Sequence, residues 1–175
     1  MDPAIYLRPL VDADVSERYV AWMNDPKTTR FLESRLRSWT VAALLEHVDR
    51  DARSDKIEAL AICLCDSKRH VGNIRLSGID RYHRHASLGL LVGEADCRSR
   101  GIGTAAIRLA CAHAFDVLGL RRVTAGCYAS NTASLRAFEK AGFAIEGRLR
   151  NRWRDVDGYV DGIIVGLVKP EVAIA

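Results

Sequence analysis

The feature that most constrains this chain is a strand, turn and helix unit near its middle. An apolar run from Leu88 to Val92 is short enough for a buried strand, and a helical pattern of alanine, isoleucine and leucine follows from Thr104. The turn Arg98-Ser-Arg-Gly-Ile-Gly103 lies between them. A helix N-terminus presents unpaired backbone N–H groups and a positive dipole end, and glycine lets a ligand approach that backbone closely. The unit therefore predicts a site for the diphosphate of a cofactor, to which the two arginines would add charge-assisted hydrogen bonds.

The remaining sequence alternates between expected strands and helices. Strands are expected where apolar and β-branched residues gather between turn residues, over residues 5–9, 58–65, 71–76, 122–128, 143–152 and 159–168. Helices are expected after capping residues, at Asp12 or Asp14, at Thr40 and at Asn131, and after Gly103 as far as Gly119, with a short turn over 29–32. Residues 77–85 are polar and are expected to form a loop. One mixed sheet with helices on both faces accommodates this order.

Composition and charge narrow the class of protein. The 175 residues fit a single domain, 1–175, in which 49% of the residues are hydrophobic and 27% are charged. No apolar run reaches the roughly 20 residues that span a bilayer, and the first residues do not resemble a signal peptide, so no membrane partner is expected. The net charge of +4 comes from arginine clusters without aromatic platforms, which predicts no nucleic-acid partner.

The five cysteines form neither a metal motif nor a redox motif. Their count is odd, no C-x-x-C pair is present, and their spacing is unlike that of zinc ligands. We expect free thiols in a reducing cytoplasm and no bound metal.

Other phosphate-binding folds are disfavoured as well. A dinucleotide fold would need a glycine where Ala106 stands, and a Walker-type loop would need Gly-Lys-Ser or Gly-Lys-Thr, which the sequence lacks.

The order of elements and two motifs resemble the GNAT superfamily of acetyl-CoA-dependent N-acetyltransferases. Arg98-Ser-Arg-Gly-Ile-Gly103 fits the acetyl-CoA motif Arg/Gln-x-x-Gly-x-Gly/Ala. A second motif follows where this family has it, as Asn131-x-x-Ser134 and then Phe138-Glu-Lys-Ala-Gly-Phe143. The resemblance covers the whole chain. It implies an α/β fold of the α+β type, with a central mixed, mostly antiparallel sheet, a splayed central strand and helices on both faces.

The resemblance also implies which residues bind acetyl-CoA. The backbone of the splayed strand would bind the pantetheine arm at Leu91 and Val92, and Asn131 would meet the pantetheine or the entering substrate. Ser134 would donate a proton to the departing thiolate. The turn would hold the pyrophosphate through Arg98, Ser99, Arg100, Gly101, Ile102, Gly103 and Thr104.

Three positions depart from the family pattern. A glycine often follows the first basic residue of the motif, where this chain has Ser99. A tyrosine common in the family is replaced by Phe138, which has no proton to donate, and this strengthens Ser134 as the acid. A glutamate that can serve as the base before the splayed strand is replaced by Ser87.

The base that deprotonates the acceptor amine is left open. An amine with a pKa near that of lysine is charged at neutral pH, so a base or a water chain must remove a proton. The candidates for base or acceptor contacts are Glu33, Asp80, His83 and His85. Cys127 is expected to be a buried strand residue rather than a covalent nucleophile, because direct transfer is usual in this family.

The acceptor itself is the least constrained prediction. Segments 22–26 and 31–35, together with the loop at 83–85, resemble enzymes that acetylate amino sugars, often as nucleotide sugars, in which Glu33 could take an ammonium group and Arg35 or Arg37 a phosphate or carboxylate. A protein N-terminus, as in ribosomal-protein acetyltransferases, is the rival acceptor. A catalytically silent acyl-CoA-binding domain is the rival from another class. Either a monomer or a homodimer is compatible with the sequence.

Overall fold

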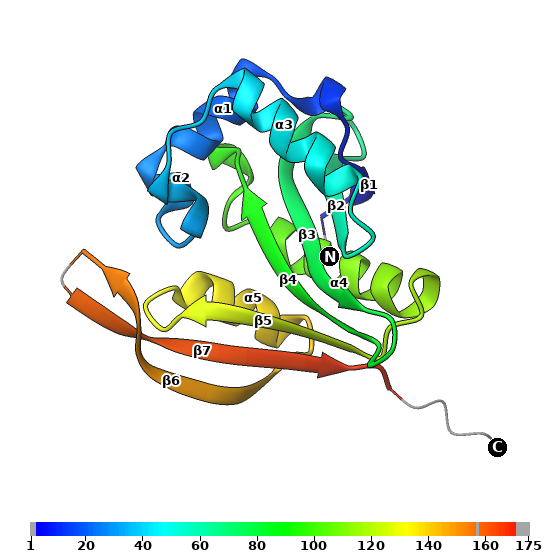
Figure 1. The fold of residues 1–175 in the computed structure, drawn as a ribbon, viewed down its shortest axis with the longest axis vertical. Helices are drawn as coiled ribbons and strands as arrows, with labels where there is room; N and C mark the ends of the chain where they lie inside the picture. Colours follow the sequence, from blue (N-terminus) through cyan, green and yellow to red (C-terminus); the bar gives the residue numbers. More distant parts are fainter. Residues whose placement is uncertain (1–2, 157, 171–175) are drawn as a thin grey trace.

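A computed structural model describes residues 3–156 and 158–170 and contains one seven-stranded sheet (Figure 1). The strands follow the order β1-β2-β3-β4-β5-β7-β6, and every neighbouring pair is antiparallel except β4 and β5. This confirms the expected mixed, mostly antiparallel sheet. The strands are β1 (Ile5–Pro9), β2 (Ile57–Leu64), β3 (His70–Asp80), β4 (His85–Val92), β5 (Arg122–Tyr128), β6 (Ala144–Asp155) and β7 (Gly158–Val168).

Helices cover both faces of this sheet, as expected. The chain places α1 (Glu17–Asn24), α2 (Pro26–Thr29) and α3 (Val41–Ala52) before β2, and α4 (Ile102–Ala112) and α5 (Thr132–Lys140) on either side of β5 in sequence. Short 3₁₀ turns are η1 (Asp12–Asp14), η2 (Glu33–Leu36) and η3 (Ala95–Cys97), and a π turn, η4 (His113–Val117), extends α4. None of the described helices is long and apolar enough to cross a bilayer.

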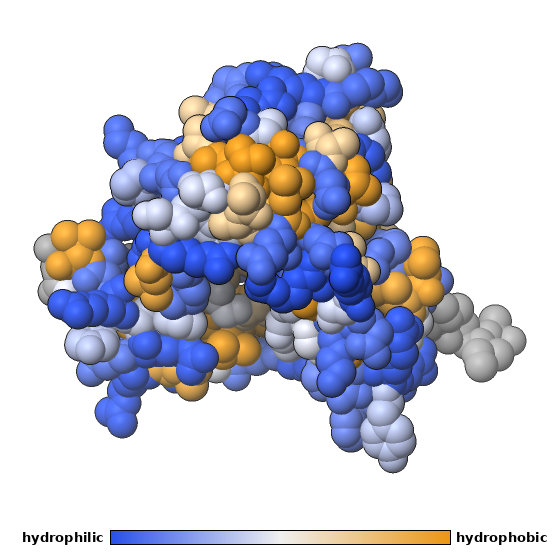
Figure 2. All heavy atoms as spheres, turned by 45° about the horizontal axis from the view of Figure 1, so that its top comes forward, coloured by the Kyte–Doolittle hydropathy of each residue, from blue (hydrophilic) through white to orange (hydrophobic). Residues whose placement is uncertain are grey.

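The core is divided into two clusters, one on each face of the sheet. Successive side chains of a strand point to opposite faces, and β2 shows this directly. Its Leu60 and Ile62 pack in the larger cluster with α4 and α5, whereas Ala61 and Cys63 pack in the smaller cluster with α1 and α3. Hydrophilic residues cover most of the face seen in Figure 2, and apolar residues gather there in smaller patches.

Several boundaries differ from the sequence-based expectation. Ser16, rather than Asp12 or Asp14, caps α1, because its side chain accepts a hydrogen bond from the backbone N–H of Tyr19. The expected loop over 77–85 is wrong: β3 and β4 form a hairpin that pairs as far as Asp80 and His85. The polar residues from Arg81 to Arg84 form the exposed turn between the two strands. Thr40 and Asn131 cap their helices as expected. In the expected turn at Asp157-Gly158, Asp157 lies outside the described residues.

The parallel strands β4 and β5 separate after a short paired stretch. Their register contains only His85↔Arg122, Ala86↔Val123 and Ser87↔Thr124. Beyond Ser87 the strands diverge, β4 toward α1 and α2 and β5 alongside β7 (Figure 1). β4 is therefore the expected splayed strand, and the part of it that does not pair with β5 borders a cleft.

Candidate active site

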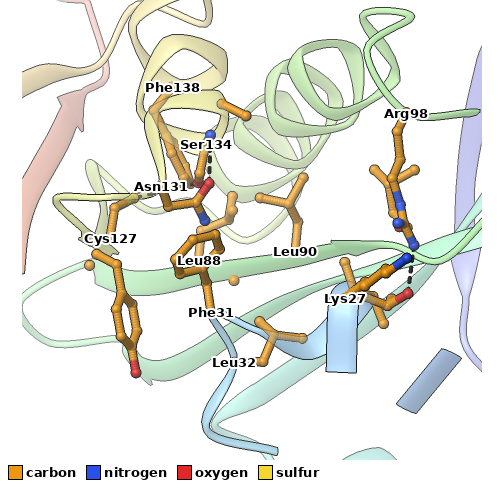
Figure 3. A pocket seen from close by; sticks show the side chains of 17 residues that line it. Lys27, Phe31, Leu32, Leu88, Leu90, Arg98, Cys127, Asn131, Ser134 and Phe138 are labelled. Atoms are coloured by element: carbon orange, nitrogen blue, oxygen red, sulfur yellow. Dashed lines mark hydrogen bonds between the residues drawn. The ribbon is translucent and has the colours of Figure 1, made fainter. Parts of the chain in front are cut away.

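A cavity of about 340 Å³ occupies the space between the diverging strands. Its walls come from the residues of β4 that no longer pair with β5, from Gly126 to Tyr128 of β5, from the start of α5, and from the segment that follows α2. Phe31 and Leu32 face Leu88 and Leu90 across it, so much of the wall is apolar (Figure 3). Such a wall suits an uncharged, flexible ligand segment.

A second cavity, of about 580 Å³, continues the cleft to the N-terminus of α4. The two cavities share several lining residues, among them Leu90, Asn131 and Ser134, so they form one continuous cleft. The outer part is basic, because Arg98, Arg136 and Lys140 line it. The cleft therefore runs from a polar, positively charged mouth to an apolar interior.

The glycine turn has the geometry that a diphosphate requires. Gly101 is the N-cap of α4 with φ +79°, and Ser99 has φ +58°, so the loop turns twice through the left-handed region. A Cβ on Gly103 would meet only Leu90 Cδ1, at 3.5 Å, so this side of the helix N-terminus opens onto the cavity. These residues fit an anion bound by backbone N–H groups at a helix N-terminus.

The two arginines of the motif lie in different surroundings. Arg98 is half-buried and fastens the loop: its Nε donates to the carbonyl of Val92 at 3.2 Å, and its Nη2 donates to the carbonyl of Gly93 at 2.8 Å and to Thr28 Oγ1 at 2.6 Å. Arg100 is exposed and donates to the carbonyl of Asp96. Arg98 thus holds the end of β4 against α2, in addition to facing the cleft.

Ser134 lies where the two parts of the cleft meet. Its backbone N–H donates to Asn131 Oδ1 at 3.2 Å, which leaves its side chain to point toward β5, where Oγ lies 3.6 Å from Cys127 Sγ. Burial raises the pKa of the Cys127 thiol, although the contact with Ser134 opposes this. A neutral thiol is a weak nucleophile. Phe138 is 2% exposed and packs edge-on against Phe143.

Tyr128 is a functional candidate that the sequence analysis missed. It is 4% exposed, lines the cleft and stacks on Trp153, with ring centroids 5.2 Å apart. Its hydroxyl donates to Glu33 Oε1 at 2.9 Å and accepts from Arg35 Nη1 at 3.0 Å. Burial and the bond to Glu33 raise the pKa of Tyr128, while Arg35 lowers it. Its place at the end of β5, three residues before Asn131, was the available signal.

The structure separates the four candidate base residues. Glu33 does not itself line either part of the cleft, but its carboxylate accepts a hydrogen bond from the hydroxyl of Tyr128, which does line it. In contrast, Asp80, His83 and His85 lie at the paired end of β4, where Asp80 accepts from the backbone N–H of His83 and the two imidazoles stack at 6.3 Å. None of these three lines either part of the cleft. The hairpin that replaced the expected loop directs them away from Ser134.

No metal centre is evident in the part of the chain that the structure describes. It contains no group of three or more His, Cys, Asp or Glu side chains placed to hold an ion. The five cysteines are all free thiols.

A glycine turn that opens into a cleft between splayed strands defines the class of CoA-dependent acyltransferases. The chain belongs to the GNAT acetyltransferase family, because the model of the acetyltransferase (GNAT) domain matches residues 4–144. It is an acetyl-CoA-dependent N-acetyltransferase.

Curated relatives and solved structures agree with this assignment. The chain is 28% identical over 177 residues to the probable N-acetyltransferase YjcK of Bacillus subtilis, with 95% of each chain covered. It is 26% identical over 99 residues to the spermidine N(1)-acetyltransferase of Escherichia coli, which covers 57% of this chain and 52% of that protein. The fold matches that of a spermidine N-acetyltransferase from Vibrio cholerae in complex with CoA and spermine, with a TM-score of 0.83, 17% identity and coverage of 94% and 95%.

Proposed function

We propose that this enzyme transfers the acetyl group of acetyl-CoA directly to the primary amine of a small molecule, with an amino sugar or a nucleotide-linked amino sugar as the favoured acceptor. One observation carries the proposal. The Ser134 hydroxyl lies where a basic, glycine-lined mouth meets an apolar cleft, and Tyr128, whose hydroxyl donates to Glu33, lines the far side of that cleft. Donor and acceptor can therefore enter from opposite sides and meet beside Ser134.

The residues that would hold the co-substrate follow from the cleft. The amides from Ser99 to Thr104 would bind the diphosphate, and Arg136 and Lys140 would add positive charge at the mouth. The edge of β4 that faces β5 has no strand partner at Leu91 and Val92, and its backbone would bind the pantetheine arm, opposite Asn131. Acetyl-CoA supplies an activated thioester there.

The proposed chemistry assigns one proton to each side of the cleft. Glu33, acting through Tyr128 or a bridging water, takes a proton from the acceptor ammonium, and the neutral nitrogen then attacks the thioester carbon. A carbon–nitrogen bond forms and the carbon–sulfur bond breaks. Ser134 protonates the departing thiolate, and the second proton of the nitrogen, which is positively charged after the attack, returns to the Ser134 oxygen. Cys127 takes no covalent part, because its raised pKa keeps the thiol protonated.

A polyamine is the second candidate acceptor. It is favoured by the similarity to the Escherichia coli spermidine N(1)-acetyltransferase and by the position of Glu33, whose carboxylate can pair with an ammonium group. A cytoplasmic location belongs to the same proposal and is supported by the five free cysteines.

Thiol release from acetyl-CoA, measured against a panel of amines, tests the proposal. The panel contains amino sugars, nucleotide-linked amino sugars, spermidine, and peptides with free N-termini. We expect the highest kcat/KM with an amino sugar or its nucleotide. Highest turnover of a peptide would replace the small-molecule acceptor with a protein N-terminus. Highest turnover of spermidine would favour the second candidate.

A further inference from the structure

A third cavity, of about 770 Å³, lies on the other side of α2 from the cleft. Lys27 and Thr28 of α2 face the cleft, whereas Pro26, Thr29 and the following Arg30 face this cavity. The far wall is the end of the β6–β7 hairpin (Figure 1). Among the described residues, the charged side chains that line it are Arg30, Arg35, Arg37 and Arg154, with Asp155 the one acidic residue.

The cavity adjoins the acceptor side of the cleft through one side chain. Arg35 lines the cavity, and its Nη1 donates to the hydroxyl of Tyr128, which lines the cleft. Its Nη2 donates to the backbone carbonyl of Arg154 on the opposite wall at 3.1 Å. An acceptor whose amine lies beside Tyr128 and Glu33 therefore has this cavity within the length of one arginine side chain.

Two of the four arginines in the cavity have no carboxylate partner among the described residues. Arg30 pairs with Asp155 at 3.3 Å, and Arg35 lies 3.7 Å from Glu33. Within the described residues, no carboxylate forms an ion pair with Arg37 or Arg154. The Arg37 guanidinium instead lies over the ring of Trp39, 3.5 Å from its centroid, which orients it without cancelling its charge.

The phosphates of the co-substrate do not account for these arginines. The mouth of the cleft has its own basic residues, Arg98, Arg136 and Lys140, around the helix N-terminus. The arginine cavity lies beyond α2 and shares no lining residue with that mouth. A polyamine with three or four positive charges would be repelled by these arginines, because like charges at close range oppose binding.

We infer that the acceptor carries an anionic group, a carboxylate or a phosphate, that binds in this arginine-lined cavity while its amine lies beside Glu33 and Tyr128. This inference rests on the proposed transfer to a small amine and names the substrate class of that same site. Guanidinium groups bind both anions through paired N–H donors. The cavity selects for acceptors with opposite charges at their two ends and against polyamines.

Binding to the CoA-saturated enzyme tests this inference without relying on turnover. Saturation with CoA fills the diphosphate site, so an added anionic sugar cannot bind there and its measured affinity belongs to another site. Calorimetry compares glucosamine, glucosamine 6-phosphate and the corresponding aminouronic acid. We expect at least one anionic sugar to bind about tenfold or more tightly than glucosamine, which corresponds to one charge-assisted hydrogen bond. The better of the two identifies a phosphate or a carboxylate as the preferred group.

Two variants locate the effect. Arg37→Gln with Arg154→Gln removes two unpaired charges from the cavity and should abolish the advantage of the anionic sugar while leaving CoA affinity unchanged. Arg53→Gln, an exposed arginine on α3 that pairs with Asp49 outside the cavity, is the matched control and should keep the advantage. Circular dichroism of each variant checks that it is folded.

Two results would overturn the inference. One is equal affinity for glucosamine and both anionic sugars, and the other is an advantage that persists in the folded double variant. The proposed function fails differently, when no amine in the panel releases thiol although the anionic sugars still bind. The two failures are therefore distinguishable.

Discussion

At the scale of single residues, the position of Ser134 is determined by two roles that use different atoms. Its backbone N–H completes the cap of α5 by donating to Asn131, whereas its hydroxyl lies in the cleft near Cys127. A serine placed only for capping would sit at the N-cap itself. Here Asn131 occupies that position, so the hydroxyl of Ser134 is available for proton transfer to the leaving thiolate.

Replacing Ser134 by alanine should therefore reduce kcat and leave the acetyl-CoA KM nearly unchanged. The alanine keeps the backbone N–H that Asn131 caps, so α5 is retained, and only the proton donor is lost. We expect kcat to fall by about a hundredfold, the usual range for a positioned acid. Steady-state thiol release at saturating acceptor measures it.

Cys127→Ala is the matched control for this experiment. It removes the neighbouring Sγ at 3.6 Å but no proposed proton donor, and it should keep most of the activity. An unchanged kcat in Ser134→Ala would remove the hydroxyl from the mechanism. A severe loss in Cys127→Ala would instead indicate a covalent role for the thiol.

Local sequence signals predicted the conformation of some candidate site residues and missed the contacts of others. The glycine turn and the Asn131 cap depend on neighbours in sequence, and they were found. Ser99 has a left-handed φ of +58°, which explains physically why glycine often stands at this position in the family. Tyr128 gains its role from Glu33 and Arg35, which are more than 90 residues away in the chain. No local pattern contains that contact.

At the scale of elements, the N-terminus of α4 contains a residue, Gly103, that matters for cofactor binding but not for the packing of the fold. Gly103 lies in the first turn of the helix, where a Cβ would meet only Leu90 Cδ1 at 3.5 Å. Glycine is also among the weaker helix formers. The packing of the protein therefore does not require a glycine here. Because glycine has no side chain, it leaves space for a ligand in the cleft.

The substitution Gly103→Val should raise the acetyl-CoA KM without lowering thermal stability. The added side chain would project into the space assigned to the diphosphate, while the helix loses its least favourable residue. We expect KM to rise by about tenfold or more, equivalent to the loss of one or two charge-assisted hydrogen bonds. Steady-state kinetics and a melting curve measure the two quantities. A normal KM in a folded variant would refute the assignment of the turn to the diphosphate.

A second element-scale feature ties η1 to β1. Asp14 accepts two hydrogen bonds from Arg8, at 2.7 and 2.6 Å, and one from the backbone N–H of Val11. Burial alone would raise the pKa of Asp14, but the bonds from Arg8 and Val11 outweigh it and hold the pKa below its ordinary value. This pairing also explains why Asp14 does not cap α1. Its carboxylate is already engaged, and Ser16 takes that role.

Asp14→Asn should destabilise the fold at neutral pH and much less in acid. A carboxylate with a lowered folded pKa stabilises the fold above its unfolded pKa, and this stabilisation disappears as pH falls through the folded value. Because the Arg8 side chain is 36% exposed, solvent screens the pair and we expect a loss of only about 1–2 kcal/mol near pH 7. Urea unfolding of both proteins at about pH 7 and about pH 3 measures the difference. A difference that is equal at both pH values would contradict the role of the charged pair.

At the scale of the whole molecule, the cleft exists because two parts of the sheet are joined by a short seam. The first part contains β1 to β4, the second contains β5, β7 and β6, and three residue pairs connect them. The family resemblance predicted this splayed arrangement. Arg35 and Arg37 were predicted as possible phosphate or carboxylate contacts. The cavity that they form with Arg30 and Arg154 was not predicted, because its walls come from α2, η2 and the end of β6, which tertiary packing alone brings together.

The part of β4 that has diverged from β5 should respond to the co-substrate more than the rest of the sheet does. Beyond Ser87, the β5-facing backbone groups of β4 have no strand partner, so their amides exchange readily with solvent unless a ligand binds them. Hydrogen-exchange mass spectrometry with and without CoA should show slower exchange in peptides covering residues 88–92 and 99–105. The fully paired β2 is the internal control and should not change. Protection confined to 99–105 would mean that the co-substrate is held only at its diphosphate, and that the splayed strand does not bind its pantetheine arm.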